Sequence, residues 1–367
     1  MAPEEFRYMQ VPEERCASCH RCPKVEEEEF DPIYRCCTYH PRLPNFQIGW
    51  ALENSETADK MQAFIAEGFA SPEGLHVTPA QHVSSLAAHA EDRFGKAGDV
   101  FCRFLNQEKR QCGIYPYRNS VCSTFFCIND GGDLGEEFWQ AMQNFMGQME
   151  TAVAQWAMEQ CGIDPTAYFQ RYDGLADKMD NLVQESGAWS AEAARELWGS
   201  DSPDIEAFYK ACGQRVLDER EQLFELVADR KLLRPHRFDL AFRDRLGPAL
   251  KAELDDTGGV GGDPIAPRDL WYQLDLAHRH LWQLPETGKH VKLSEKAQWQ
   301  DREDDRYPVK LHVGKARLYL TTAEKRYMEQ FSSPLPVNND LVFGSDDVDG
   351  RRLLTEALAK GILQVQS

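Results

Sequence analysis

The sequence is short of positive charge and contains no long apolar run. Its 41 Lys and Arg residues stand against 60 Asp and Glu, the formal net charge is −19, and the sequence pI is about 5.0. Nucleic acids and anionic membrane surfaces bind basic patches, so this charge balance argues against both partners. No apolar run approaches the ~20 residues that a membrane-spanning helix needs. The sequence therefore predicts a protein that binds neither nucleic acid nor a membrane.

Signals for export and for nucleotide binding are also missing. The first residues, Met-Ala-Pro-Glu-Glu, lack the basic and then apolar pattern of a secretory signal. The glycine-rich run 258–262 follows no strand pattern and precedes no Lys-Ser/Thr pair, so we interpret it as a linker. The odd number of cysteines, 11, fits a disulfide framework poorly. We expect a cytoplasmic protein whose thiols stay reduced.

Cysteine is abundant in the N-terminal third of the chain, where nine of the 11 cysteines lie within the first 127 residues. Thiolates are soft ligands that select zinc, copper(I) or iron–sulfur clusters. The same stretches are basic in an acidic chain: three bases and no acids lie between residues 15 and 25, and four bases and one acid between 102 and 127. Positive neighbours stabilise thiolates. The sequence therefore predicts a metal centre, with these candidate ligands: Cys16, Cys19, Cys22, Cys36, Cys37, Cys102, Cys112, Cys122 and Cys127.

The spacing of the first three cysteines bears on the metal. Cys16, Cys19 and Cys22 are each separated by two residues, as in the bacterial ferredoxin run in which three cysteines share one cluster. Zinc sites usually combine two Cys-x2-Cys pairs in a closed tetrahedron. The third cysteine favours an iron–sulfur cluster, [4Fe–4S], and zinc is the alternative. The adjacent Cys36 and Cys37 are hard to place on one metal, because neighbouring side chains diverge.

Two histidines and two further cysteines are weaker candidates. His20 lies between candidate ligands and His40 follows the vicinal cysteines, so each could bind or support the metal, although a packing or solvated role is favoured. Cys161 and Cys212 lie on expected helix faces and are assigned to packing.

The pattern of apolar residues predicts a mainly α fold with small modules at both ends. We expect an irregular, partly β, cysteine-rich metal module over residues 1–130 and a helical domain packed on it over 131–285. Its most regular helix has apolar side chains at three- and four-residue steps between residues 134 and 157. Helix starts are expected at Thr78-Pro79, Asp164-Pro165 and Ser190. Residues 286–367 alternate like strands around two helices and resemble a winged-helix or PqqD-like peptide-binding module.

The second cysteine set carries a family resemblance. Cys102-Arg-Phe-Leu, Cys112-Gly-Ile-Tyr-Pro-Tyr-Arg118 and Cys122-Ser-Thr-Phe-Phe-Cys127 resemble the second half of the YkgJ-like cysteine-cluster family, a zinc- or iron-chelating domain named for a CxxCxxCC run. The resemblance covers residues 16–127. Thirteen residues separate Cys22 from Cys36 where the family has a contiguous run, which leaves open which early cysteines bind metal. It implies that Tyr115 and Arg118 support the cofactor site.

Flagellin lysine N-methylase is a relative within that family. The resemblance therefore implies a metal-centred enzyme that modifies a protein or peptide, with transfer of a methyl group from S-adenosylmethionine, although no residues independently indicate a methyl-donor site. Two other functions stay open. The chain could be a non-catalytic partner-binding protein whose fold is stabilised by structural zinc. It could also be a metal carrier or redox sensor, since cysteines beyond four could exchange metal or oxidise.

Overall fold

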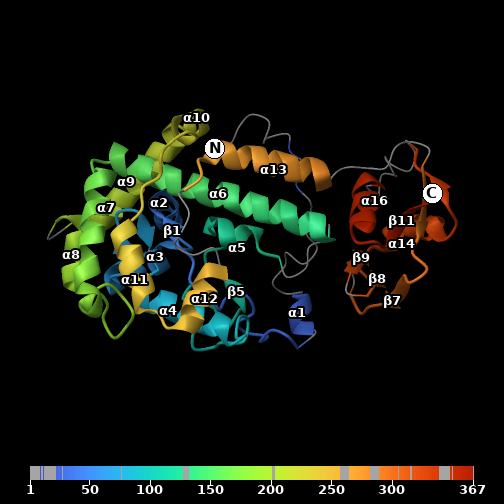
Figure 1. The fold of residues 1–367 in the computed structure, drawn as a ribbon, viewed down its shortest axis with the longest axis horizontal. Coiled ribbons are helices and arrows are strands. Elements are labelled where there is room, and N and C mark those ends of the chain that lie inside the picture. Colours follow the sequence, from blue (N-terminus) through green and yellow to red (C-terminus); the bar gives the residue numbers. More distant parts are fainter. Residues whose placement is uncertain are drawn as a thin grey trace. The chain divides into compact units, whose positions relative to one another are not determined.

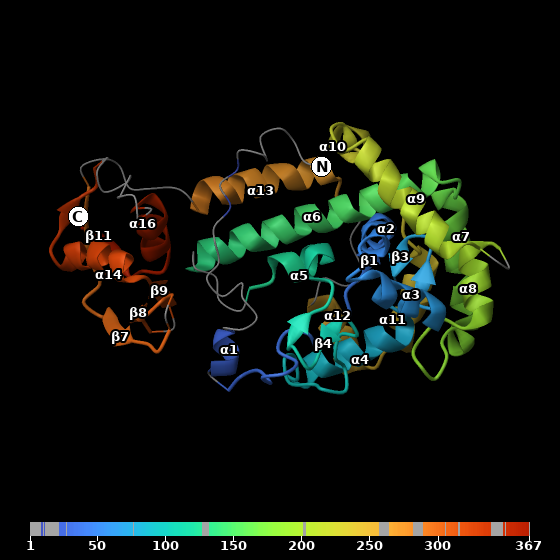
Figure 2. The same cartoon turned by 180° about the vertical axis from the view of Figure 1, so that it is seen from behind.

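The structure is a computed structural model that describes residues 9, 11, 22–26, 28–75, 77–126, 132–200, 203–256, 264–281, 289–304, 306–314, 316–338, 348 and 350–366. The described residues are mainly helical and carry four small sheets of two or three strands (Figures 1 and 2). The prediction of a mainly α fold is thus confirmed. Among the described helices, none combines the length and apolar character needed to cross a membrane.

The chain divides into two compact units. The described residues of unit 1 come from 22–123 and 143–270, and those of unit 2 from 124–142 and 271–366, together with residues 9 and 11. The long helices α6 (Gly132–Gln160) and α13 (Pro267–Leu281) contribute to both units. The division at residues 130 and 285 stays a prediction.

Unit 1 begins irregularly and becomes helical. Its first part holds α1 (Pro23–Glu26), β1 (Leu43–Pro44), α2 (Asn45–Glu53), α3 (Ala58–Glu67), β2 (Ala70–Ser71), β3 (Gly74–Leu75), α4 (Pro79–Ala90), β4 (Leu105–Asn106), β5 (Gln111–Cys112), η3 (Tyr115–Tyr117) and α5 (Ser120–Thr124). Its second part holds the end of α6, then α7 (Pro165–Gly174), η4 (Leu175–Asn181), α8 (Ala191–Trp198), α9 (Ile205–Asp218), α10 (Leu223–Val227), α11 (His236–Arg245) and α12 (Pro248–Asp256).

The helix starts in unit 1 follow from local side-chain chemistry. Thr78 accepts the N–H of Gln81 and Gln81 caps Thr78 in return, which is a capping box, and a proline occupies the first turn. Asp164 and Ser190 cap α7 and α8 by accepting the backbone N–H of Thr166 and of Ala193, respectively. These starts agree with the sequence prediction. The module that the sequence predicts to be irregular and partly β contains the hairpin β4–β5, but its short helix α5 was not foreseen.

A close helix crossing holds the two parts of unit 1 together. Helix α2 packs on α9 (Figure 1), and Gly49 lies so near the backbone carbonyl of Tyr209 that a Cβ atom there would clash. The adjoining core joins apolar side chains of residues 43–114 to those of 188–209, including the buried Ile48, Phe104 and Trp198. The sheet of order β1-β3-β2 lies beside this crossing, with Leu43 paired to Leu75 and Ser71 to Gly74.

The C-terminal part of unit 2 has a core of its own. Two three-stranded sheets, β10-β6-β11 and β7-β8-β9, accompany α14, η5 and α16 around apolar side chains such as Val291, Phe331 and Leu353. The bounds are β6 (His290–Leu293), β7 (Gln298–Asp301), β8 (Val309–Val313), β9 (Ala316–Leu320), α14 (Thr322–Glu329), η5 (Gln330–Ser332), β10 (Leu335–Pro336), α16 (Gly350–Ala359) and β11 (Leu363–Gln366). The order of strands and helices expected from the sequence is present, and the winged-helix resemblance stays a prediction.

Candidate metal centre and adjoining cavity

Six of the eight described cysteines lie in the first part of unit 1, within residues 22–123. Cys22 precedes α1 and Cys36 and Cys37 lie in the turns that follow it, whereas Cys102 precedes the hairpin, Cys112 ends β5 and Cys122 lies in α5. The N–H of Cys102 donates to the carbonyl of Cys37 at 2.6 Å, which ties the first cysteine set to the second. No disulfide joins any two of the eight described cysteines.

The six thiols lie close enough to act on one another electrostatically. Cys36 interacts with Cys22 and Cys37, Cys37 with Cys102 and Cys112, and Cys122 with Cys36, Cys102 and Cys112. Chain segments up to a hundred residues apart in sequence therefore converge on one place in unit 1.

Burial and neighbouring thiols control the pKa values of this cluster. A hydrogen bond from Cys37 lowers the pKa of Cys36, and the same hydrogen bond raises the pKa of Cys37. Burial raises the pKa of Cys102 to about 12 and also raises the pKa of Cys112 and Cys122. Without a bound metal ion, Cys102, Cys112 and Cys122 hold their protons at neutral pH. A bound metal ion would reverse this balance, because it deprotonates coordinating thiols.

Two cations, Arg118 and Lys60, lie near enough to act on Cys112, and Arg118 also acts on Cys36 and Cys122. The Arg118 guanidinium lies 3.9 Å from the centroid of the Tyr115 ring and donates to the carbonyls of Tyr115 and Cys122. Its charge favours the thiolate forms of Cys36 and Cys112, and also that of Cys122. Of the two residues that the family resemblance singled out, Arg118 thus lies at the cluster and Tyr115 lies against Arg118.

The ligand set cannot be completed from the described residues. Cys16, Cys19, Cys127 and His20 lie outside them. Within the part of the chain that the structure describes, no three His, Cys, Asp or Glu side chains form a group that could hold a metal ion. The chemistry of the described donors, which are reduced and mutually interacting thiols, suits zinc or an iron–sulfur cluster. Their geometry alone provides no complete site, and the assignment of ligands stays a prediction.

The remaining candidates lie apart from the thiol cluster or beside it. Cys161 and Cys212 form a second thiol pair, in which a hydrogen bond lowers the pKa of Cys161 and raises that of Cys212. His40 lines a cavity of about 20 Å³ together with Cys102, a space for about one water molecule. Burial lowers the pKa of His40 to about 4, so this imidazole is neutral at pH 7.

A larger cavity, lined by both polar and apolar side chains, adjoins the thiol cluster. It measures about 180 Å³ and is lined from the β1 region, the β2–β3 turn, the start of α5 and the face of α6, with Arg42, Glu73, Ser120 and Glu150 among its polar side chains. Tyr39 also lines it and connects it to the cluster, because Tyr39 interacts electrostatically with both Cys122 and Glu150. Burial raises the pKa of Tyr39 to about 12.

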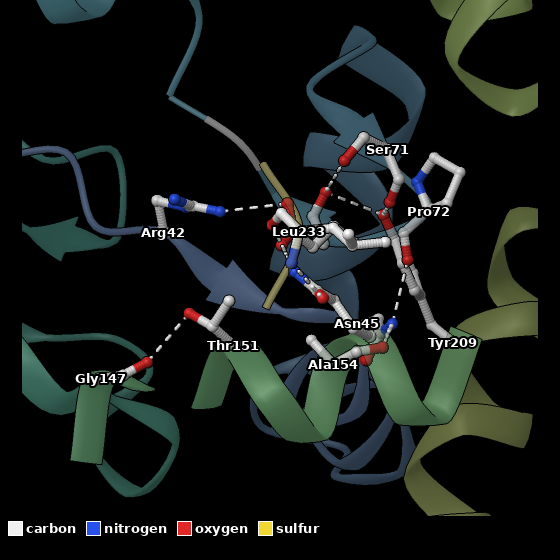
Figure 3. A network of polar contacts seen from close by, with 12 residues as sticks. Arg42, Asn45, Ser71, Pro72, Gly147, Thr151, Ala154, Tyr209 and Leu233 are labelled. Atoms are coloured by element: carbon white, nitrogen blue, oxygen red, sulfur yellow. Dashed lines mark hydrogen bonds and ion pairs between the residues drawn. The ribbon is translucent and has the colours of Figure 1, made fainter. Parts of the chain in front are cut away.

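A network of hydrogen bonds fixes one side of this cavity (Figure 3). Asn45 donates to the carbonyls of Pro72 and Ala154, both at 3.0 Å, and so ties the β2–β3 turn to α6. The Tyr209 hydroxyl donates to the carbonyl of Ser71 at 2.7 Å. The buried Glu73, in the same turn, accepts from Arg42 at 3.1 Å. Rigid supports of this kind hold polar side chains in fixed positions.

Glu150 is an unusual carboxylate on this wall. It accepts from the backbone N–H and the hydroxyl of Ser120, each at 2.7 Å, and from the side-chain amide of Gln47 at 3.1 Å. Burial raises the pKa of Glu150 to about 7, although these three hydrogen bonds and Arg42 oppose the rise. A carboxyl group with this pKa can take up or release a proton at neutral pH.

Sequence reasoning missed the cavity residues. Glu150 lies four residues after Met146 and three before Val153, so it is a charged residue at the apolar spacing of α6, and that irregularity was the signal available. Arg42 and Tyr39 closely follow the vicinal cysteines in sequence, but nothing in that spacing indicates that they meet α6.

Comparisons with protein-family models, with curated proteins and with solved structures give no match for this chain.

Proposed function

We propose that this chain is a metal-centre protein in which cysteine thiolates hold an iron–sulfur cluster, with zinc as the next choice. The adjoining cavity receives a compound on which this metal centre acts. The observation that carries the proposal is the convergence of six cysteine side chains from distant stretches of unit 1. Protonated thiols stabilise an irregular segment little by themselves, whereas thiolates on a metal can hold such a segment together.

The cavity favours catalysis over a purely structural metal. A structural metal site needs only a closed set of ligands. Here Tyr39 interacts with both Cys122 and Glu150, and both Tyr39 and Glu150 line a solvent-accessible cavity. The family resemblance extends the proposal to modification of a protein or peptide, with methyl transfer from S-adenosylmethionine by analogy. A structural zinc site and a metal carrier or redox sensor are the competing functions.

The test is purification without oxygen, followed by a visible spectrum and by counts of iron, acid-labile sulfide and zinc per chain. A brown protein with iron and sulfide in a fixed ratio supports the proposed cluster. A colourless protein with one zinc per chain would support the structural function instead. Calorimetric titration with S-adenosylmethionine then tests the methylase analogy, which an absence of binding would remove.

A further inference from the structure

The guanidinium of Arg42 has far more hydrogen-bonding capacity than its neighbours use. An arginine side chain carries five N–H donors, and among the described residues Arg42 spends one of them, on Glu73. Its side chain is 52% exposed, whereas that of Glu73 is 5% exposed.

This exposure is directed into the cavity. Glu73, Tyr39, Tyr168 and Tyr172 act electrostatically on the guanidinium, and Arg42 in turn acts on His82, Glu150 and Asp239. Because the Arg42 side chain has so many neighbouring groups and is still half exposed, it must line a cavity. Arg42 is indeed one of the residues that line the cavity of about 180 Å³.

The unused N–H donors of Arg42 are suited to bind a carboxylate. The planar guanidinium fork presents parallel N–H groups that match the two oxygens of a carboxylate. Asn45, Gln155 and the β2–β3 turn hold Glu73 in place, so the guanidinium is oriented before any ligand arrives.

The size and the charges of the cavity restrict the ligand further. A cavity of about 150 Å³ takes benzene, so 180 Å³ admits a molecule of only a few more atoms. The wall also carries Glu150, and Glu73 is already paired with Arg42. An ammonium group near Glu150 would offset the charge of that carboxylate, and a carboxylate on Arg42 would offset the charge of the guanidinium.

We propose that the cavity binds a small free amino acid, with its carboxylate on Arg42 and its ammonium group toward Glu150. The proposed function is needed only for what happens after binding, because the site consists of Arg42, Glu73 and Glu150 and not of the thiols.

Titration calorimetry with glycine, L-alanine, L-serine and L-glutamate tests the site, on protein purified without oxygen and analysed for metal in the same sample. Propionate and ethylamine, which each keep one end of L-alanine, and N-acetylglycine, which lacks the ammonium group, are the matched ligands. We expect saturable binding of at least one amino acid and about 10-fold weaker binding of its one-ended analogues, since a hydrogen-bonded charge contributes about this factor.

Variants locate the binding. Arg42→Gln should abolish it, and Arg42→Lys, which keeps the charge but not the fork, should weaken it about 10-fold. Arg93→Gln is the control, because Arg93 is paired with Glu91 and Asp99 at the surface, and it should bind like the wild type. If Arg42→Gln does not fold, Arg42→Lys decides.

The inference is overturned if none of the four amino acids binds, if N-acetylglycine binds as tightly as glycine, or if Arg42→Lys binds unchanged. Binding in a sample without metal would leave the inference standing and remove the proposed function. Metal without binding would do the reverse.

Discussion

Replacement of Glu150 by Gln should remove a pH dependence from the stability of unit 1. The carboxyl group of Glu150 has its pKa raised from an ordinary 4.5 to about 7. The folded state therefore binds about one more proton than the unfolded state between these pH values. Stability falls as pH rises wherever the folded state binds more protons. The contribution of this group is fully present below pH 4.5 and is lost by the time the pH exceeds 7.

The size of the effect follows from the difference of about 2.5 pKa units. At about 1.4 kcal/mol per unit, the wild type should lose about 3 kcal/mol of unfolding free energy relative to Glu150→Gln between pH 4.5 and 7.5. The neighbours that could change this figure are Arg42 and Tyr39 in the cavity, and Ser120 and Gln47, which donate to the carboxylate. Glutamine keeps the shape and one of the two acceptor oxygens, so the comparison isolates the charge.

Urea unfolding followed by circular dichroism at several pH values measures the difference. Glu136→Gln is the matched control, because Glu136 is an exposed glutamate on the same helix, and its pH profile should follow the wild type. A wild type that gains stability relative to Glu150→Gln as pH rises would refute the reasoning. It would mean that the three hydrogen bonds outweigh burial and hold the pKa of Glu150 below 4.5.

Three further predictions test the fold and the metal. Gly49→Ala should destabilise unit 1 by about 1–3 kcal/mol in urea unfolding, because the new Cβ atom clashes with the Tyr209 carbonyl. The control Gly174→Ala, whose new Cβ atom makes only an ordinary contact, should be neutral or slightly stabilising. Equal effects of the two substitutions would contradict the close crossing of α2 and α9. Thr321→Ala removes the capping box of α14 and should cost the C-terminal part about 1 kcal/mol, measured by thermal unfolding, whereas an unchanged transition would count against the cap. Removal of the metal by a chelator should speed amide exchange in residues 28–44, and unchanged exchange there would show that the metal does not hold this segment.

Elements set by local chemistry could be predicted from the sequence. Thr78 with Pro79 and Asp164 with Pro165 begin helices because the capping and backbone preferences lie within a few neighbouring residues. The long helix α6 followed from its apolar spacing. The short helix α5 could not be predicted, because its five residues carry no periodic signal.

The cavity could not be predicted for a different reason. Arg42 and Glu73 are separated by 31 residues, and Glu150 joins them only because α6 packs beside the β2–β3 turn through Asn45. No local pattern encodes such a meeting of distant segments. The convergence of the thiols was partly foreseeable, since soft-ligand chemistry groups cysteines whatever their separation, but the pairing of Cys36 with Cys37 rather than with a more distant thiol was not.

The central claim is tested most directly by the metal content of two single variants purified together without oxygen. Cys112→Ser removes a thiol of the cluster, and Cys161→Ser removes a partly buried thiol of the separate pair with Cys212. The account predicts a stoichiometric metal in the wild type and in Cys161→Ser, and a large loss in Cys112→Ser. Equal metal in both variants, or none in the wild type, would contradict it.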